Sequence, residues 1–487
     1  TYASWTFRKA AKFFDVVTWT GNGAATQTIS HNLGSVPGCI ICKGTSFASG
    51  WWTYHQSSSG SPLQSYLELN TTDASASAGR NIWGATSTTI TVDSGLDLTT
   101  SGQTYVAYLF AHNAGGFGLT GTDNVISCGS YTGNGSTSGP TVTLGYEPQW
   151  LLVKQSSASG EYWNLVDSMR GMSMKANNLL FPDLSAAEYV DSGTGGYNAI
   201  TPTATGFSLR TNDPSFNANA ATYIYIAIRR GPMKVPTDGT KVFNTNTATS
   251  NLPAYPSSFP VDMQFARPTG GDSNTYLSSR LTGATGLFTD NTGAEYDWSY
   301  STFDYQNGWY SYTGFGSGNR SWMFKRAPGF FDEVCYTGTG STQTVPHNLG
   351  VVPELIILKS RVATTASDWV VYDAFSANPP AAGTYPFMCL NRTDGRNGGY
   401  AYSWVAFGNQ RPTASNFYTN DNFNSMDNSG KTEVAYLFAT CPGVSKVGSY
   451  TGNGTSQTIN CGFAAGARFI LIKCTSTTGN WYVSVSY

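Results

Sequence analysis

Charged residues are scarce in this sequence. Lysine, arginine, aspartate and glutamate make up 11% of the 487 residues, against about a quarter in typical soluble domains. The 27 basic and 29 acidic side chains nearly cancel. Such a chain has no broad positive field to attract phosphate groups, so we expect neither nucleic acid nor an anionic membrane surface as a partner.

Cysteines and long apolar runs are scarce as well. The eight cysteines are too few for a disulfide scaffold. Cys39 and Cys42 form the single Cys-x-x-Cys pair, and Leu355 and Leu358 take their places in a later repeat. We therefore predict buried hydrophobic side chains at this pair, because zinc would need two further ligands. No apolar run approaches the length of a membrane-spanning helix. We expect no metal and no cofactor.

The rest of the sequence is rich in glycine and aromatic residues. The chain has 54 glycines, and aromatics make up 14%. Short β-branched or aromatic runs, such as residues 16–20, 89–92 and 105–111, are separated by Gly, Asn, Pro and Ser. Seven or eight runs in about 100 residues indicate a β-sandwich. No long amphipathic helix competes with this interpretation.

One five-residue motif shows that the chain is a tandem repeat. Tyr-Thr-Gly-Asn-Gly at residues 131–135 returns at 450–454, with near copies at 19–23 and 336–340. Because it follows the first strand of each unit, we predict that it forms a hairpin turn. Trp5 and Trp322, in matching motifs, lie 317 positions apart (322 − 5). Three units therefore form one superrepeat of about 317 residues.

The predicted fold is all-β, a series of tandem antiparallel β-sandwiches of jelly-roll or lectin-like character, each of about 100 residues. The units span residues 14–113, 125–231, 232–328 (degenerate) and 330–441; residues 1–13 are the last strand of a preceding unit, and 445–487 are the first half of a fifth. The first residues resemble neither a signal peptide nor a translation start. We expect the chain to be a segment of a larger polypeptide.

A tryptophan recurs eight to ten residues after a lysine in four units. Recurrent tryptophans in sandwiches usually belong to the core. Aromatic rings can also form surface platforms on which sugars stack. We favour the core, and we keep a surface or glycan contact open for these four residues: Trp52, Trp163, Trp369 and Trp481.

No catalytic set is common to the units. Asp167 and Asp373 each lie four residues after a tryptophan, but His55 and Val485 stand at the same place in other units. A glycosidase would need two carboxylates facing one bond. We therefore predict that the protein is not an enzyme, although an acid–base pair confined to one unit stays open.

Two further motifs have a structural and a functional interpretation. His31 and His347 each begin a His-Asn-Leu-Gly motif, but the second unit reaches its Leu-Gly through Val142 and Thr143. We therefore favour turn formation over ligand contact. Residues 420–428 are rich in oxygen ligands that could hold Ca²⁺, yet they lack the glycine and terminal glutamate of an EF-hand loop. We predict a solvated turn there.

The repeated motifs resemble a known family. They are Ser-Trp-Thr-Phe-Arg-Lys-Ala at residues 4–10 followed by Phe-Phe-Asp, the Tyr-Thr-Gly-Asn-Gly motif, His-Asn-Leu-Gly-Ser-Val-Pro at 31–37, and Tyr-Val-Ala-Tyr-Leu-Phe-Ala at 105–111. Together they look like a repeated domain of unknown function from structural and tail-associated proteins of marine tailed bacteriophages, over essentially the whole chain. The Ile-x-His-x-Leu-Gly-x-x-Pro pattern is also similar to short β-sandwich modules at phage fibre tips. The resemblance supplies no activity and no site residues.

This resemblance implies a non-enzymatic virion structural protein, a tail-fibre or appendage component that contacts the host cell surface. It implies a homo-oligomer in the extracellular virion particle, with other virion proteins and host surface glycans as partners. The alternative is a secreted lectin-like adhesin that binds carbohydrate. A third interpretation, a polysaccharide depolymerase, has no support in the sequence. Because the units are small and joined by short linkers, we expect the stability of each to be local.

Overall fold

The protein folds almost entirely into antiparallel β-sheets, which confirms the predicted all-β sandwich class. The computed structural model describes residues 3–190, 199–268, 274–297, 301–311, 319–362, 367–375, 387–396, 407, 410–420 and 427–486. Short helices complete the described part: η1 (Pro62–Gln64), η2 (Ser94–Leu96), α1 (Pro214–Asn217) and η3 (Gly239–Lys241). Within these ranges no helix has the length and apolar character needed to cross a membrane.

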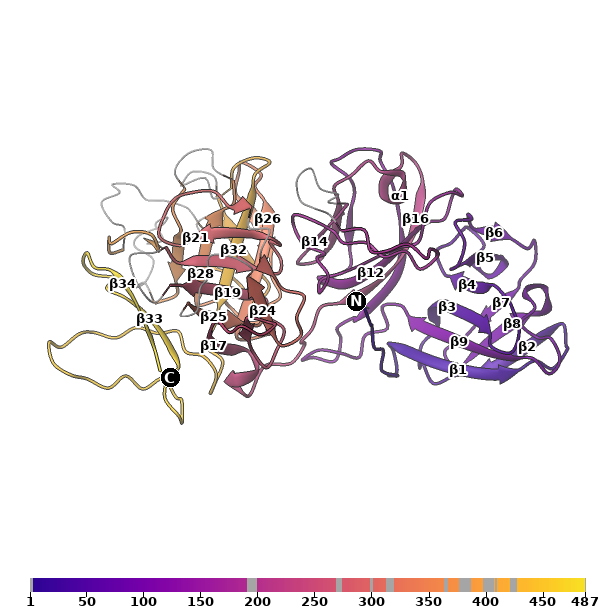
Figure 1. Cartoon of the computed structure of the whole chain (residues 1–487), viewed down its shortest axis with the longest axis horizontal. Helices are drawn as coiled ribbons and strands as arrows, with labels where there is room; N and C mark the ends of the chain where they lie inside the picture. The colour runs from indigo at the N-terminus through magenta and orange to yellow at the C-terminus, as the bar shows by residue number, and fades with distance from the viewer. Residues whose placement is uncertain are drawn as a thin grey trace. The chain divides into compact units, whose positions relative to one another are not determined.

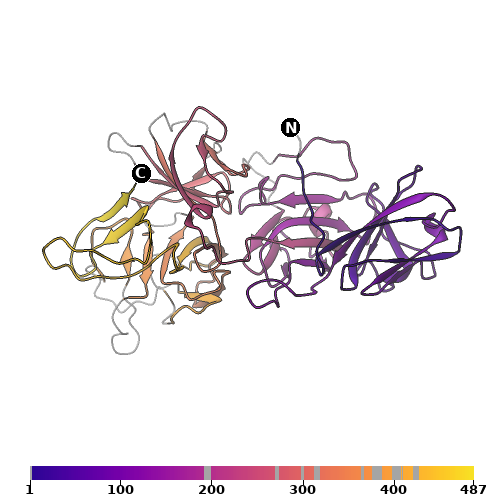
Figure 2. The ribbon, with the colours of Figure 1, turned by 90° about the horizontal axis from the view of Figure 1, so that it is seen from below.

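Sandwich 1, residues 14–113, is built from a six-stranded and a three-stranded sheet (Figures 1 and 2). The order of the large sheet is β1-β9-β3-β4-β5-β6, and that of the small sheet is β2-β8-β7. The strands are β1 (Phe14–Thr20), β2 (Thr26–Ser30), β3 (Pro37–Gly44), β4 (Trp51–His55), β5 (Ser65–Glu68), β6 (Ala76–Ser77), β7 (Trp83–Ala85), β8 (Thr89–Asp93) and β9 (Thr104–Ala111).

Sandwich 2, residues 125–231, repeats this plan with fewer strands. Its large sheet has the order β10-β16-β12-β13 and its small sheet the order β11-β15-β14. The strands are β10 (Ile126–Thr132), β11 (Thr141–Thr143), β12 (Pro148–Gln155), β13 (Asn164–Asp167), β14 (Ile200–Thr203), β15 (Gly206–Leu209) and β16 (Thr222–Arg229).

Sandwich 3, residues 232–328, has the sheets β17-β25-β19-β20-β21-β22 and β18-β24-β23. Its strands are β17 (Phe243–Thr247), β18 (Tyr255–Pro256), β19 (Met263–Arg267), β20 (Tyr276–Ser279), β21 (Thr285–Phe288), β22 (Tyr296–Asp297), β23 (Ser301–Thr302), β24 (Gly308–Ser311) and β25 (Arg320–Phe324). The unit that we expected to be degenerate therefore keeps the two-sheet plan.

Sandwich 4, residues 330–441, has the sheets β26-β32-β28-β29-β30 and β27-β31, and the half-sandwich, residues 445–486, has the pair β33-β34. Their strands are β26 (Phe331–Thr337), β27 (Gln343–Pro346), β28 (Leu355–Ser360), β29 (Val370–Asp373), β30 (Met388–Cys389), β31 (Asn416–Thr419), β32 (Thr432–Phe438), β33 (Phe469–Lys473) and β34 (Trp481–Val485). All four large sheets place the closing strand between the opening strand and the apolar strand.

The Tyr-Thr-Gly-Asn-Gly motif is not a hairpin turn, which corrects the sequence prediction. β1 pairs with β9 and β2 pairs with β8, so the motif carries the chain from one sheet to the other. Its first glycine approaches a neighbouring backbone so closely that a Cβ on Gly133 would lie 2.2 Å from the Ala218 carbonyl oxygen. Its second glycine, Gly135, has φ +66°. Both positions require glycine because of backbone geometry.

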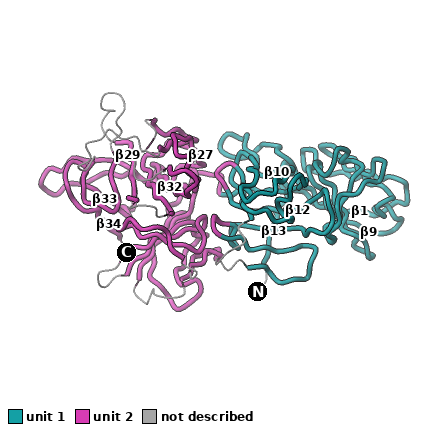
Figure 3. Tube along the Cα trace, turned by 90° about the horizontal axis from the view of Figure 1, so that it is seen from above, with its two compact units in different colours: residues 1–172, 176–202, 206–231 teal, residues 173–175, 203–205, 232–487 magenta. Residues whose placement is uncertain are grey.

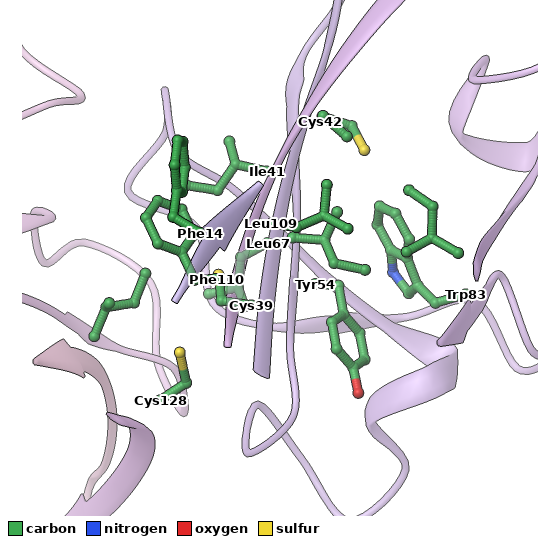
Figure 4. Close-up of a cluster of buried hydrophobic side chains, with 14 of the residues drawn as sticks. Phe14, Cys39, Ile41, Cys42, Tyr54, Leu67, Trp83, Leu109, Phe110 and Cys128 are labelled. Atoms are coloured by element: carbon green, nitrogen blue, oxygen red, sulfur yellow. The ribbon is translucent and has the colours of Figure 1, made fainter. Parts of the chain in front are cut away.

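Alternate residues of each large sheet serve different cores. In β16, Tyr223, Tyr225 and Ala227 belong to the core of sandwich 2. The intervening isoleucines of β16 belong to a cluster shared with sandwich 1. Figure 4 shows the same alternation in sandwich 1, where Cys39 lies toward Cys128 of sandwich 2, and Cys42 lies toward Trp83 of its own core. Since successive strand residues point to opposite faces, each large sheet is buried on both sides.

The chain forms two compact units, shown in Figure 3. Unit 1 comprises Thr1–Met172, Ala176–Pro202 and Gly206–Gly231; unit 2 comprises Ser173–Lys175, Thr203–Thr205 and Pro232–Tyr487. Sandwiches 1 and 2 share one apolar cluster, and sandwiches 3 and 4 share another. A shared core couples the stability of its members. This arrangement favours a folding unit larger than the single sandwich expected from the sequence.

Candidate functional site

The recurrent tryptophans lie at the start of the strand that follows the apolar strand. Trp163 is 3% exposed and Trp369 is fully buried. Trp52 and Trp481 are half-buried. The indole nitrogens of Trp163, Trp369 and Trp481 each donate a hydrogen bond to a backbone carbonyl of a neighbouring sandwich.

Sandwich 2 binds sandwich 1 through a lysine and a tryptophan. Trp163 donates from Nε1 to the Glu68 carbonyl oxygen at 3.1 Å. Lys154 donates from Nζ to the Thr72 carbonyl oxygen at 3.0 Å, and to the Glu161 carbonyl oxygen of its own sandwich at 2.6 Å. The Ser75 amide donates in return to the Ser156 carbonyl oxygen at 2.9 Å. We call this arrangement a Lys–Trp joint.

Sandwich 4 binds sandwich 3 through the same joint. Trp369 donates from Nε1 to the Phe288 carbonyl oxygen at 2.9 Å. Lys359 donates to the carbonyl oxygen of Thr292 at 3.3 Å, and to that of Ser367 at 2.9 Å. The reciprocal backbone bond runs from the amide of Glu295 to the carbonyl oxygen of Arg361 at 2.9 Å.

A third Lys–Trp joint links the half-sandwich to sandwich 4. Trp481 donates to the Cys389 carbonyl oxygen at 2.9 Å, and Lys473 donates to the Thr393 carbonyl oxygen at 2.8 Å. Arg396 donates from its amide to the Thr475 carbonyl oxygen at 2.9 Å. In all three joints the lysine acceptor lies four residues after the tryptophan acceptor, and the reciprocal amide lies seven residues after it. This common spacing makes the joint a repeated structural device.

Lysine and tryptophan suit this position for a physical reason. The acceptors are backbone carbonyls at the interface between two sheets, where an unpaired carbonyl would be costly. Tryptophan supplies a donor together with a large apolar surface. Lysine supplies several donors at the end of an apolar stem and can therefore bind carbonyls on both sandwiches. Burial lowers the pKa of Lys154 and Lys473, and it lowers the pKa of Lys359 to about 8.

In sandwich 1 the matching tryptophan is Trp51, which corrects the assignment of Trp52 from sequence spacing. Strand register places Trp51 opposite Lys43, as it places Trp481 opposite Lys473. The Trp51 carbonyl accepts a bond from the Leu69 amide at 3.0 Å, as the Trp369 carbonyl accepts one from the Leu390 amide at 2.9 Å. Trp52 lies on the opposite face and packs edge-on against Tyr66 at 5.3 Å.

These positions bear on the glycan interpretation. The rings of Trp163 and Trp369 are buried against neighbouring sandwiches, so they offer no face on which a sugar could stack in this arrangement. Trp481 is half-buried, and Lys473 lies over its ring at 5.8 Å. Trp163 and Trp369 therefore lie buried at the contact between two sandwiches, whereas Trp52 and Trp481 stay partly exposed.

Sandwich 3 lacks the Lys–Trp joint on its own apolar strand. Arg267 takes the lysine position, since it pairs with Arg320 as Lys359 pairs with Val434. Thr275 takes the tryptophan position, because its carbonyl accepts the Thr289 amide at 3.0 Å. The long segment of unit 2, Pro232–Tyr487, also begins with sandwich 3. The division of the chain therefore falls at the sandwich that does not carry the lysine and tryptophan.

The other candidate residues have structural roles where the structure describes them. Cys39 and Cys42 are buried, as predicted, and burial raises the pKa of both thiols. His31 and His347 each accept the amide of the leucine two residues ahead, at 3.1 and 3.2 Å, which is the turn geometry that the sequence favoured. Among the described residues no group of three or more His, Cys, Asp or Glu side chains could hold a metal ion.

Asp167 and Asp373 lie in ion pairs. Asp167 accepts from Arg170 Nε at 2.6 Å and from Trp5 Nε1 at 3.0 Å. Asp373 pairs with Arg396 Nη2 at 2.7 Å. The calcium interpretation of residues 420–428 falls largely on residues 421–426, which lie outside the described ranges.

Sequence reasoning found the lysines and tryptophans but missed their partners. The acceptors are backbone carbonyls of residues as different as Glu68, Phe288 and Cys389. Side-chain identity at these positions carries no signal, because any residue presents the same carbonyl. The recurrence of a tryptophan eight to ten residues after a lysine was the one available clue.

The fold and its joints define a class of tandem β-sandwich proteins whose neighbouring sheets pack on each other. Residues 7–232 and 324–486 match the family described as "Domain of unknown function (DUF7483)". This match spans most of the chain, so the chain belongs to that family. A comparison with curated proteins found no match.

Proposed function

We propose that this protein is a non-enzymatic structural component of a bacteriophage virion, a tail fibre or related appendage that contacts the host cell surface. The observation that most supports a structural role is the repetition of the Lys–Trp joint, with the same spacing between its acceptor residues, in three places. The lysine and tryptophan side chains that recur from unit to unit hold neighbouring sandwiches together, so their recurrence is explained by assembly.

The joint supports a mechanical role. Each one combines an apolar contact between two sheets with directed hydrogen bonds in both directions across the interface. Hydrogen bonds of fixed geometry prevent the two sheets from sliding or rotating past one another, whereas an apolar surface alone would allow it. A tandem array with such joints is stiff within each unit, which suits a fibre or appendage.

The assignment to a virion rests on the resemblance of the repeated motifs to tail-associated phage proteins. In this proposal the protein is homo-oligomeric, lies in the extracellular particle, and binds other virion proteins. Contact with host glycans falls to loops, which commonly carry recognition. The alternative, a secreted lectin-like adhesin, would need aromatic platforms other than Trp163 and Trp369, since these two rings are buried.

Mass spectrometry and immunogold labelling of purified virions test this proposal. We expect the protein among the virion components and the label on an external appendage. Absence from purified particles would contradict the proposal. Detection in the culture supernatant free of particles, together with binding on a glycan array, would favour the adhesin.

A further inference from the structure

Residues 4–9 contact sandwiches 1 and 2. Their contacts match those that β25, the closing strand of sandwich 3, makes with sandwich 4 and the half-sandwich. The ring of Phe7 lies 5.3 Å from Phe14, 5.9 Å from Phe110 and 6.0 Å from Trp150. In unit 2 the ring of Phe324 lies 5.8 Å from Phe331, 6.0 Å from Phe438 and 5.9 Å from Phe469. The two phenylalanines therefore occupy the same place in units 1 and 2.

The backbone and charges around these phenylalanines agree as well. Ala10 bridges to Phe14 as Ala327 bridges to Phe331. Lys9 pairs with Asp15 at 3.1 Å, and Arg326 pairs with Asp332 at 3.8 Å. One difference stands out: residues 320–324 form β25, hydrogen-bonded to β17 and β19, whereas residues 3–9 belong to no β-ladder of the described structure.

Lys43 and Trp51 form one half of a Lys–Trp joint. Lys43 donates to the Ser49 carbonyl oxygen, as the other joint lysines donate to carbonyls of their own sandwich. No residue that the structure describes supplies Lys43 with the second carbonyl, or Trp51 Nε1 with the acceptor, that the matching residues have in the three complete joints. Both side chains are half-buried and so are accessible to a further partner.

In unit 2 the matching residues, Lys359 and Trp369, have sandwich 3 as their partner. The acceptors for Trp369 and Lys359 lie at the end of β21 and in the segment after it. β21 belongs to the same sheet as β25, the strand that residues 4–9 match. A sandwich that takes residues 4–9 as its closing strand would therefore present its β21 counterpart to Lys43 and Trp51.

We propose that Lys43 and Trp51 bind a further β-sandwich of this family, one that is continuous with residues 4–9 and uses them as its closing strand. Unit 1 then becomes a three-sandwich assembly like that of sandwich 3, sandwich 4 and the half-sandwich. The partner is covalently continuous for a steric reason. A sandwich from a second copy would bring its own closing strand, and residues 4–9 already occupy that place. This inference does not depend on the proposed virion role.

A fusion protein tests this inference with the chain's own third sandwich. Residues 232–320 are joined directly ahead of Ser4, so that residues 4–8 replace 321–325 as the closing strand. Hydrogen exchange of the amides of residues 4–8 reports whether the strand enters a sheet, and hydroxyl-radical oxidation of Trp51, read by peptide mass spectrometry, reports docking. We expect both to be protected in the fusion, with Trp51 oxidation falling to the level of Trp369 in the same sample.

Two outcomes would overturn the inference. If residues 4–8 are protected but Trp51 stays as reactive as in the unfused chain, a sandwich forms without binding Lys43 and Trp51. If neither changes, residues 4–9 are not the closing strand of such a sandwich. A Trp51→Phe variant serves as the matched control. It should lower the melting temperature of unit 1 in the fusion, just as we expect Trp369→Phe to lower that of unit 2. In the unfused chain it should leave the melting temperature of unit 1 unchanged.

Discussion

Trp369 of sandwich 4 donates a hydrogen bond from its indole nitrogen to the carbonyl oxygen of Phe288 in sandwich 3, at 2.9 Å. Trp369 lies directly ahead of β29, and Phe288 is the last residue of β21. An equivalent hydrogen bond runs from Trp163 to Glu68, and from Trp481 to Cys389. Removal of the donor should therefore weaken the contact between sandwiches.

Replacement of Trp369 with phenylalanine keeps an apolar ring and removes the Nε1 donor. The Phe288 carbonyl would be left without its partner at the interface. We expect the free energy of unfolding of unit 2 to fall by about 1–3 kcal/mol, measured by denaturant unfolding. Trp51→Phe is the matched control and should change the stability of unit 1 by less than about 0.5 kcal/mol. Equal losses in both variants would refute the role of the acceptor.

Replacement of Lys359 with methionine should change how stability depends on pH. Burial lowers the pKa of Lys359 from 10.5 to about 8. Between these two values the unfolded chain binds the proton more strongly, so this residue makes the folded state more stable as pH rises from 8 toward 10.5. We expect Lys359→Met to lose that increase in urea unfolding experiments over this pH range. The same slope in wild type and variant would contradict the pKa shift.

Glu433 should make the stability of the fold fall, rather than rise, with increasing pH, and it should do so at lower pH than Lys359. This carboxyl is buried at β32, and burial raises its pKa from 4.5 to about 8, partly opposed by a hydrogen bond from Ser360 and by the charge of Lys359. Its protonated form stabilises the fold below pH 4.5, and this stabilisation is lost as pH rises to about 8. Glu433→Gln should show a smaller decline in stability over this window, by chemical denaturation at a series of pH values. A parallel decline in the variant would count against the shift.

Replacement of Phe324 with alanine should strongly destabilise unit 2. Phe324 is 5% exposed, and its ring lies 5.0 Å from Phe243 of sandwich 3, 5.8 Å from Phe331 of sandwich 4 and 5.9 Å from Phe469 of the half-sandwich. Loss of a buried phenylalanine costs about 3–5 kcal/mol because a cavity remains. Phe7→Ala, at the matching half-buried place in unit 1, should cost less. Calorimetry of both variants measures the difference, and a larger loss for Phe7→Ala would contradict it.

Strand positions could be predicted well because they depend on local residue patterns. The predicted strand at residues 105–111 is observed as β9 (Thr104–Ala111), and that at residues 89–92 as β8 (Thr89–Asp93). The connection at residues 20–26 was mistaken for a hairpin. Its glycines indicate a tight path for the backbone but do not say which strands pair, since pairing is decided by tertiary contacts.

The joint could be predicted only in part. The spacing between Lys154 and Trp163 revealed a recurrent pair, but two adjacent tryptophans in sandwich 1 made the choice between Trp51 and Trp52 depend on register. A shift of one residue moves a side chain to the other face of the sheet. The acceptors were invisible to sequence reasoning, because backbone carbonyls carry no residue signature.

Hydrogen exchange of the Trp163→Phe variant tests the central claim most directly. If Trp163 joins the two sandwiches, loss of its donor should speed amide exchange in β13 of sandwich 2 and in β5 of sandwich 1, which holds the Glu68 acceptor. Exchange in β28 and β29 of unit 2 should not change. Faster exchange confined to β13, with β5 as protected as in the wild type, would contradict the account.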